Sequence, residues 1–205
     1  AGATGYGRSK VACENYVRGL QASGAPISIS YPATVIGPDD PGLTEAHVGL
    51  RTYLQQFVPL MPSGTQYVDV RDIAAVHLQL LEQPASAGRY ILGGHYLPWR
   101  EHGGLLRRVT GRKPLEVPLN PALMRLAGRL FDRLGDYVAL QLPLTEEGIS
   151  YATRWVLMDN RSVEEGLGFR FRPLEVSFRD AINWLYKTGY ITAGQAGNAA
   201  ASVPG

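Results

Sequence analysis

The 205-residue sequence is poor in cysteine, and its single cysteine, Cys13, excludes a disulfide within the chain. Small secreted domains commonly depend on disulfides, so this scarcity favours a reducing compartment. The sequence also lacks a charged segment followed by an apolar run of signal-peptide length, and no run approaches the about 20 apolar residues of a membrane span. We therefore expect a cytoplasmic protein with no membrane partner.

An excess of charge of one sign is absent as well. Twenty Lys and Arg residues stand against 18 Asp and Glu, a formal net charge of +2, whereas nucleic-acid-binding proteins usually carry a basic surplus. We expect no nucleic-acid partner. The four histidines show no HxxxH or HExxH spacing, which argues against a metal site; they are His47, His77, His95 and His102.

What the sequence does contain is typical of an α/β protein: 24 glycines, 14 prolines and 45% hydrophobic residues. Helical and strand patterns alternate, as in βαβ units. We expect helices at 11–21, 46–56, 72–81 and 101–110, and strands at 27–31, 67–70 and 89–92. In the third helix Asp72 is expected to be the cap, Leu81 to lie on the apolar face, and residues 59–64 to form a loop.

Beyond Gly111 the spacing becomes irregular and proline-bounded, which indicates a smaller lobe. Within it an apolar stripe over 123–134 predicts a helix, Ser162 begins a capping-box pattern, and Leu174, Phe178, Ile182 and Leu185 share the face of a closing helix. The expected division is residues 1–111, 112–192, and a disordered tail of small residues at 193–205.

The opening segment AGATGYGRSK allows two interpretations. One is a glycine-rich loop that binds a dinucleotide pyrophosphate. Such a loop needs a preceding strand, a suitably placed third glycine and an acidic residue about 20 positions later. None of the three is found here, so we prefer the other interpretation, in which Tyr6 and Lys10 are a functional pair.

Tyr6 and Lys10 are four residues apart and would share one face of a helix. A lysine ammonium near a phenol stabilises the phenolate, which suits a tyrosine for general acid/base chemistry. The YxxxK spacing alone is weak, because an ordinary surface helix can carry the same two residues. The segments around this pair make the functional interpretation more specific.

Four segments, in order, resemble those of the extended short-chain dehydrogenases/reductases, the NAD-dependent epimerase/dehydratase family. Residues 6–14 resemble YxxSKxxxE, and residues 31–38 resemble a strand ending RPxxVxGP. Residues 67–74 resemble VxVxDxA, and residues 156–184 resemble the family's C-terminal close. The order and number of these segments make the resemblance far more specific than any one of them.

The resemblance implies an α/β fold, the C-terminal part of a doubly wound, Rossmann-type parallel sheet with a smaller, mostly helical substrate lobe. It makes Tyr6 the catalytic acid/base and a cofactor-binding residue. It makes Lys10 a second catalytic residue, which tunes Tyr6 and binds the nicotinamide ribose. It places Pro32, Ala33 and Val35 against the nicotinamide of NAD or NADP. The family's strand and GxxGxxG loop would lie upstream of Ala1, so the cofactor-binding half is expected outside this chain.

Several residues have simpler expected roles. Glu14 is expected to pair with Lys10 at i, i+4 spacing, and Cys13 to be a small buried residue. Asp39 and Asp40 are expected to be solvated, while Asp69 and Asp72 shape a strand-to-helix turn. Tyr31 departs from the family pattern, which has Arg before the proline.

The function that the resemblance implies is an NAD(P)-dependent oxidoreductase acting on a carbonyl or alcohol of a small, hydrophobic substrate. The segment from Pro32 to Pro38 is closest in style to the dihydroflavonol reductase and hydroxysteroid dehydrogenase branch. Two alternatives stay open, a nucleotide-sugar epimerase or dehydratase and a non-catalytic half-Rossmann interaction module. The chain alone is expected to be inactive, and a homodimer is left open.

Overall fold

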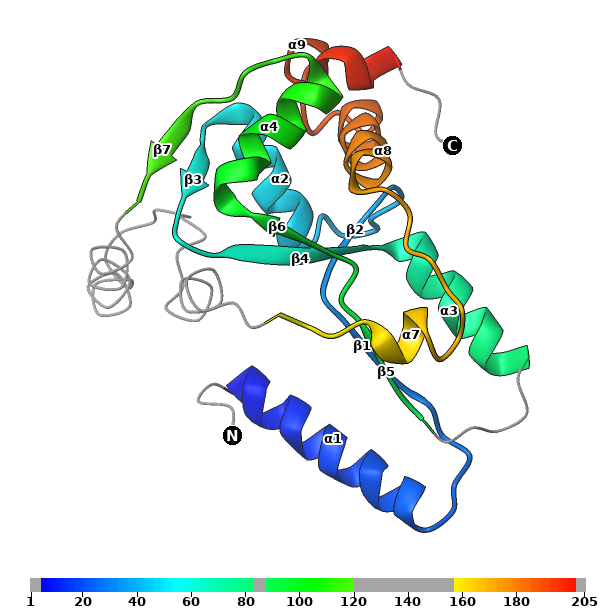
Figure 1. The fold of residues 1–205 in the computed structure, drawn as a ribbon. Helices are drawn as coiled ribbons and strands as arrows, with labels where there is room; N and C mark the ends of the chain where they lie inside the picture. Colours follow the sequence, from blue (N-terminus) through cyan, green and yellow to red (C-terminus); the bar gives the residue numbers. More distant parts are fainter. Residues whose placement is uncertain (1–4, 83–87, 120–156, 202–205) are drawn as a thin grey trace.

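The structure is a computed structural model that describes residues 5–82, 88–119 and 157–201 (Figure 1). The strands form three small sheets, of which each contains one parallel pair. These pairs are β1 (Ile29–Pro32) with β5 (Arg89–Leu92), β2 (Thr34–Ile36) with β4 (Gly64–Asp69), and β3 (Val58–Leu60) with β7 (Glu116–Pro118). Strand β6 (His95–Pro98) is antiparallel to β4. The predicted parallel α/β architecture is confirmed.

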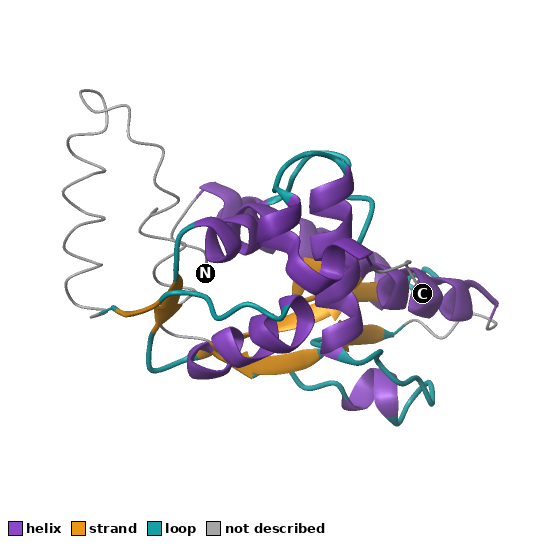
Figure 2. Cartoon of the chain, turned by 90° about the horizontal axis from the view of Figure 1, so that it is seen from above, coloured by secondary structure: helices purple, strands orange, loops and turns teal. Residues whose placement is uncertain are grey.

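Helices lie to both sides of the strands, as the view from above shows (Figure 2). In the first half of the chain they are α1 (Gly5–Ala22), α2 (Glu45–Gln55), α3 (Val70–Glu82) and α4 (Trp99–Thr110). In the last part they are α7 (Arg161–Glu164), α8 (Leu174–Lys187), α9 (Ala193–Ala196) and the 3-10 helix η1 (Gly197–Ala201). Gly111 ends α4 in the left-handed conformation, φ 73°, as its sequence position predicts.

Strands β1 and β2 follow each other with only Ala33 between them, yet they pair with different partners. Ala33 N–H still donates to Leu92 O on β5, at 3.0 Å, whereas Thr34 begins the pairing with β4. The chain thus passes from one sheet to the next within a single extended segment. The functional residues predicted at positions 32–35 lie at this crossover.

Helix α8 lies at the centre of the larger core, against α4, α2 and β4. The apolar residues predicted to share one face of the closing helix are all buried, with Phe178 1% exposed and Ile182 and Leu185 fully buried. That prediction is confirmed. The apolar stripe predicted over 123–134, and with it most of the predicted helical lobe, falls outside the described residues, and the division at 111 stays a prediction.

The tail predicted to be disordered is ordered over residues 193–201, which corrects the sequence interpretation. Thr192 caps α9 in a reciprocal capping box with Gln195, and Ala196 and Ala199 are fully buried against α8. Gly197, at φ 56°, lies so close to α4 that a Cβ would overlap the Thr110 carbonyl oxygen. Small residues there permit close packing, which composition alone does not distinguish from disorder.

Other local predictions are also corrected. Residues 59 and 60 of the loop expected at 59–64 belong to β3, Gly64 begins β4, and β6 was not predicted. Ser162 does not cap a helix, since α7 already begins at Arg161 and the Ser162 hydroxyl accepts from Ile91 N–H at 3.1 Å.

Helix α3 differs from its prediction at two residues. It begins at Val70, so Asp72 lies inside its first turn, and the side chain of Leu81 is exposed. The strand and helix are joined without an intervening turn, which shifts the helix start and its buried face.

Candidate functional site

Helix α1 carries the Tyr6–Lys10 pair and stands apart from the core. None of its residues is buried. It runs antiparallel to β1, so its N-terminal end lies toward the end of β1 that leads to Pro32 (Figure 1). This arrangement directs the pair toward the carboxyl end of a strand, where α/β proteins place their ligands.

The predicted sharing of one helical face by Tyr6 and Lys10 is confirmed. Lys10 Nζ lies over the Tyr6 ring, 5.3 Å from its centroid, a cation–π distance. The Tyr6 side chain is 62% exposed. An accessible phenol beside an ammonium is an arrangement that can exchange a proton with a ligand.

Glu14 does not pair with Lys10, contrary to the expectation from their spacing. Both oxygens of its carboxylate lie 2.7 Å from the Tyr31 hydroxyl, and Arg18 Nε is 3.8 Å away. Burial, followed by the hydrogen bond and negative charge of Glu14, raises the pKa of Tyr31 to about 12, so the phenol remains a donor. The ammonium of Lys10 is therefore not neutralised by Glu14.

The other predicted site residues occupy the crossover between β1 and β2. Pro32 is exposed, while Ala33 and Val35 are half-buried and pack against the core cluster that contains Val68. Thr34 Oγ1 lies 3.2 Å from Thr65 Oγ1 on β4. The contact of Pro32, Ala33 and Val35 with a nicotinamide remains a prediction.

An open groove of about 1120 Å³ lies between α1, the β1·β5 sheet and the segment around α7. Its lining includes Glu14, Tyr31, Arg89 and Arg161. Charges of both signs face this groove, and it belongs to the face of β1 next to α1. No local sequence pattern predicts this groove, because its walls come from three separate segments.

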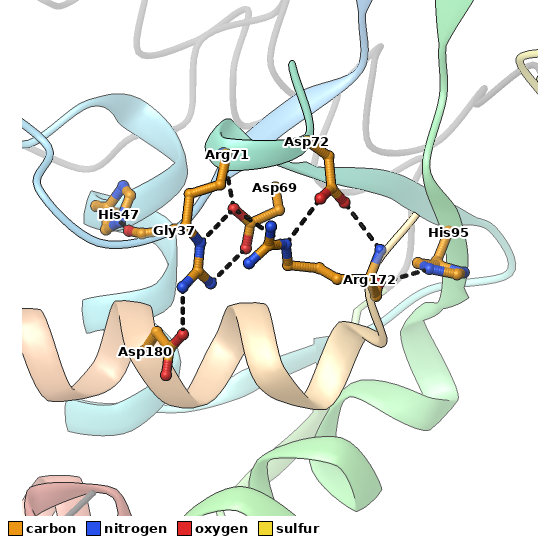
Figure 3. Close-up of polar contacts among 8 residues, drawn as sticks. All are labelled: Gly37, His47, Asp69, Arg71, Asp72, His95, Arg172 and Asp180. Carbon is orange, nitrogen blue, oxygen red and sulfur yellow. Dashed lines mark hydrogen bonds and ion pairs between the residues drawn. The ribbon is translucent and has the colours of Figure 1, made fainter. Parts of the chain in front are cut away.

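Asp69 and Asp72 belong to a charge network that joins β4 and α3 to the C-terminal region (Figure 3). Asp69 accepts from Arg71 N–H at 2.8 Å and from Arg71 Nε at 2.9 Å, and Arg71 Nη1 reaches Asp180 of α8 at 2.7 Å. Arg172 donates to Asp72 from both its backbone N–H and its Nε. Burial raises the pKa of Asp69, but the hydrogen bonds, chiefly from Arg71, outweigh it and hold that pKa below its ordinary value. The network supports the predicted structural role.

Asp40 is not solvated as expected. Its side chain is 4% exposed and lies 2.8 Å from His47 Nδ1, while His47 Nε2 lies 2.7 Å from the Gly37 carbonyl oxygen (Figure 3 shows the latter pair). The one sequence signal for this arrangement was Asp40 before Pro41-Gly42, a turn-forming pattern.

The remaining candidates have ordinary partners. His77 Nε2 lies 2.8 Å from Ser30 Oγ, and His102 is bonded within the core by Tyr67 and the Pro98 carbonyl. Cys13 is exposed, which corrects the expectation of a buried residue. Over residues 5–82, 88–119 and 157–201, no three His, Cys, Asp or Glu side chains are grouped to hold a metal ion, and no helix is long and apolar enough to cross a membrane.

The model of the NAD dependent epimerase/dehydratase family matches residues 2–93. This segment, just under half of the chain, resembles the family. The predicted resemblance to the extended short-chain dehydrogenases/reductases is thereby confirmed. The matched segment holds Tyr6, Lys10 and the β1–β2 crossover, so all predicted site residues lie within it.

Two curated relatives of this chain have reductase names. A putative dihydroflavonol 4-reductase of Synechocystis is 26% identical over 197 residues, which cover 91% of this chain and 56% of the relative. Cinnamoyl-CoA reductase 2 of Arabidopsis thaliana is 32% identical over 101 residues, 48% of this chain and 29% of the relative. The chain thus spans little more than half the length of the dihydroflavonol reductase relative.

Solved structures of the family share the fold. A nucleoside-diphosphate-sugar epimerase from Pseudomonas aeruginosa superposes with a TM-score of 0.69 at 23% identity, covering 94% of this chain and 58% of that one. An enzyme of Bordetella bronchiseptica in complex with NAD gives 0.61 at 17% identity, covering 97% and 53%. The predicted cofactor, NAD or NADP, agrees with the family description and with this complex.

Proposed function

We propose that this chain provides the catalytic helix of an NAD(P)-dependent oxidoreductase that interconverts a carbonyl and an alcohol on a small, hydrophobic substrate. The observation that carries the proposal is the position of Lys10 over the exposed Tyr6 ring, with Glu14 engaged by Tyr31. An ammonium free of the nearby carboxylate can stabilise a phenolate and bind ribose hydroxyls.

In this reaction the residues of the chain would have the following roles. A bound, reduced nicotinamide supplies a hydride to the carbonyl carbon. Tyr6 gives its hydroxyl proton to the carbonyl oxygen, completing the alcohol, and takes a proton in the reverse direction. Lys10 stabilises the resulting phenolate and binds the ribose. Pro32, Ala33 and Val35 would contact the nicotinamide ring.

The proposal includes a dinucleotide-binding half contributed by polypeptide outside these 205 residues. Among the described strands β1 pairs with β5 alone, and the far side of β5 is covered by Ser162 and Asn160, which accept from Ile91 N–H and Gly93 N–H. The other edge of β1 is where further parallel strands of a doubly wound sheet would pair. The exposed side chains of α1 and the relatives' greater length support the same proposal.

A reductase is favoured over the nucleotide-sugar epimerase or dehydratase alternative. The two curated relatives named above carry reductase names. The epimerase structures resemble this chain at under 25% identity, which supports the fold and leaves the reaction open.

The test uses the polypeptide of the complete reading frame that contains these residues. Oxidation of NADPH or NADH would be followed with aromatic and alicyclic aldehydes and ketones, and UDP-sugar epimerisation would be assayed in parallel. Tyr6→Phe should lower turnover by about 10² to 10⁴-fold. Tyr16→Phe, at a 71% exposed tyrosine of the same helix, is the matched control and should leave turnover unchanged.

Two outcomes would overturn this proposal. Undiminished turnover in Tyr6→Phe would remove the acid/base role, and epimerisation without net carbonyl reduction would establish the alternative. Calorimetry of the 205-residue chain tests the missing half separately, because binding of NAD or NADP in the low micromolar range would show that the chain already holds a dinucleotide site.

A further inference from the structure

The loop from Gly37 to Thr44, called here the β2–α2 loop, leaves the carboxyl end of β2 in an unfavourable backbone conformation. Asp39 and Leu43 have φ values of 62° and 51°, in the left-handed region that residues other than glycine rarely adopt. Gly37 is required at its start, because a Cβ there would lie 2.8 Å from Val70 Cγ1. A loop with two such residues needs strong local contacts to hold one conformation.

The carboxylate of Asp40 supplies those contacts. It accepts from Gly42 N–H at 3.1 Å, from Thr44 N–H at 2.7 Å and from the Thr44 hydroxyl at 2.8 Å, in addition to His47 Nδ1. Burial raises its pKa, but the hydrogen bonds and the charge of His47 outweigh burial and hold it below its ordinary value. Asp40 is therefore ionised and can act only as an acceptor.

The His47 ring lies between two acceptors. Nδ1 faces the ionised Asp40, and Nε2 faces the backbone carbonyl of Gly37, which has no proton to give. A neutral ring that donates from Nε2 to Gly37 would leave Nδ1 against the Asp40 carboxylate. The Thr44 hydroxyl lies 3.4 Å from Nδ1 but donates to Asp40 at the shorter distance of 2.8 Å. Only the doubly protonated ring donates to both partners.

His102 provides the contrast within the same molecule. Its ring also lies between two partners, but Nδ1 donates to the Pro98 carbonyl while Nε2 accepts from the Tyr67 hydroxyl. A neutral ring satisfies both bonds. The two buried histidines thus require different protonation states for geometric reasons alone.

We propose that doubly protonated His47 is a pH-sensitive latch that holds the β2–α2 loop by joining Asp40 to the Gly37 carbonyl. Loss of the second ring proton would break one of these two hydrogen bonds. The strained loop would then lose the link between Asp40 and the Gly37 carbonyl. The loop lies at the carboxyl end of a parallel strand, the edge at which α/β proteins bind ligands, so its order bears on ligand entry. The latch itself does not rest on the proposed oxidoreductase function.

Few other charges face the ring. Helix α8 presents Trp184 edge-on, with ring centroids 5.4 Å apart, and the neighbouring elements β2, β3 and α9 carry no ionisable side chain. Asp69 lies beyond Gly37 and is bound by Arg71. The two acidic side chains of α8 have partners on other helices: Asp180 is bound by Arg71, and Glu175 is bound by Arg108. For Arg179, Tyr186 and Lys187 of α8 the described structure gives no bond to the ring. Asp40 is thus the charged partner that governs the latch.

The experiment is a pH series of ¹⁵N NMR spectra and amide hydrogen exchange on the 205-residue chain. At mildly acidic pH, His47 should show two protonated ring nitrogens, while His102 in the same spectrum should show one. As pH rises, the protection of the Gly42 and Thr44 amides, corrected for intrinsic exchange, should fall with the same midpoint as the His47 ring transition. An unprotonated His47 nitrogen at a pH where both amides remain protected would overturn the proposal.

Variants separate the latch from general stability. His47→Gln should lower Gly42 and Thr44 protection by about 10-fold or more and remove its pH midpoint, since a charge-assisted hydrogen bond is lost. His77→Gln, at an exposed histidine, should change neither the protection of the Gly42 and Thr44 amides nor its pH midpoint. If His47→Gln fails to fold, the pH series on the unaltered chain still decides. Protection in His47→Gln equal to the parent at every pH would contradict the latch.

Discussion

The Tyr31 hydroxyl of β1 and the Glu14 carboxylate of α1 lie 2.7 Å apart at both carboxylate oxygens. This bond connects helix α1, which carries Tyr6 and Lys10, to the sheet. It also engages Glu14, which the spacing had paired with Lys10. Because α1 buries no residue, this charge-assisted hydrogen bond and the contact of Gln21 Nε2 with the Gly88 carbonyl oxygen, at 3.4 Å, contribute to its attachment.

Removing this bond should loosen α1 locally. In Tyr31→Phe and in Glu14→Gln, amide exchange within α1 should quicken by about 10-fold, because a hydrogen bond to a charged group contributes about 1.5–3 kcal/mol. Amides of α8 should be unchanged. The double variant should be no worse than the more affected single variant, whereas strictly additive effects would show that the two side chains act independently.

Lys10 should matter for cofactor binding as well as for rate. In the complete polypeptide, Lys10→Ala should weaken binding of reduced cofactor by about 10-fold or more through loss of a charged donor, and should also lower turnover. Fluorescence titration measures the first effect. Lys113→Ala, which removes an exposed lysine far along the chain, is the control. Unchanged cofactor affinity in Lys10→Ala would leave Lys10 without its proposed ribose contact.

His102 should make the fold sensitive to acid. Burial, opposed only by the bond to the Pro98 carbonyl, lowers the pKa of His102 from 6.5 to about 4, so the unfolded chain binds the proton more readily. The stability associated with a neutral ring is complete above pH 6.5 and declines as pH falls toward 4, by about 1.4 kcal/mol per pH unit. Urea unfolding at neutral pH and near pH 5 should differ by about 2 kcal/mol from this group. His102→Gln should flatten the dependence, while His77→Gln should not.

The Arg71 network should be sensitive to loss of its central guanidinium. Arg71→Met removes the nearest cationic partner of the buried Asp69 and Asp180 carboxylates, leaving Asp69 with Arg172 Nε at 3.7 Å, and should lower the free energy of unfolding by about 3–5 kcal/mol. Arg161→Met breaks an exposed pair with Asp159 and should leave the free energy of unfolding nearly unchanged. Chemical denaturation of both variants makes the comparison. Similar small losses in both would show that burial does not strengthen the Arg71 contacts.

The ordered tail gives a further test at Gly197. Gly197→Ala should destabilise the protein by about 2 kcal/mol or more, since the new methyl group meets the Thr110 carbonyl and the residue has φ 56°. Gly194→Ala, where a Cβ finds only Thr192 Oγ1 at 3.8 Å, is the control and should be near neutral. Thermal unfolding distinguishes the two variants. Equal melting temperatures would contradict the ordered packing of the tail and support the disorder predicted from its composition.

Local patterns alone predicted much of this protein. The closing helix followed from the spacing of Leu174, Phe178, Ile182 and Leu185, strand β5 was predicted with its observed bounds, and Gly111 marked the end of α4. Tyr6 and Lys10 share a face because a helix places residues four apart together. Each of these features depends on neighbours in the sequence, so the sequence contains the information directly.

Tertiary structure determined which side chains bind one another. Glu14 binds Tyr31, 17 residues away, in preference to Lys10 at four. His47 meets Asp40 and Gly37, and Arg172 meets Asp72 at a separation of 100 residues. The alanines and glycines of the tail are ordered by the surfaces of α4 and α8. Ion pairs, hydrogen bonds and close packing depend on distances between segments, and only the folded chain fixes those distances.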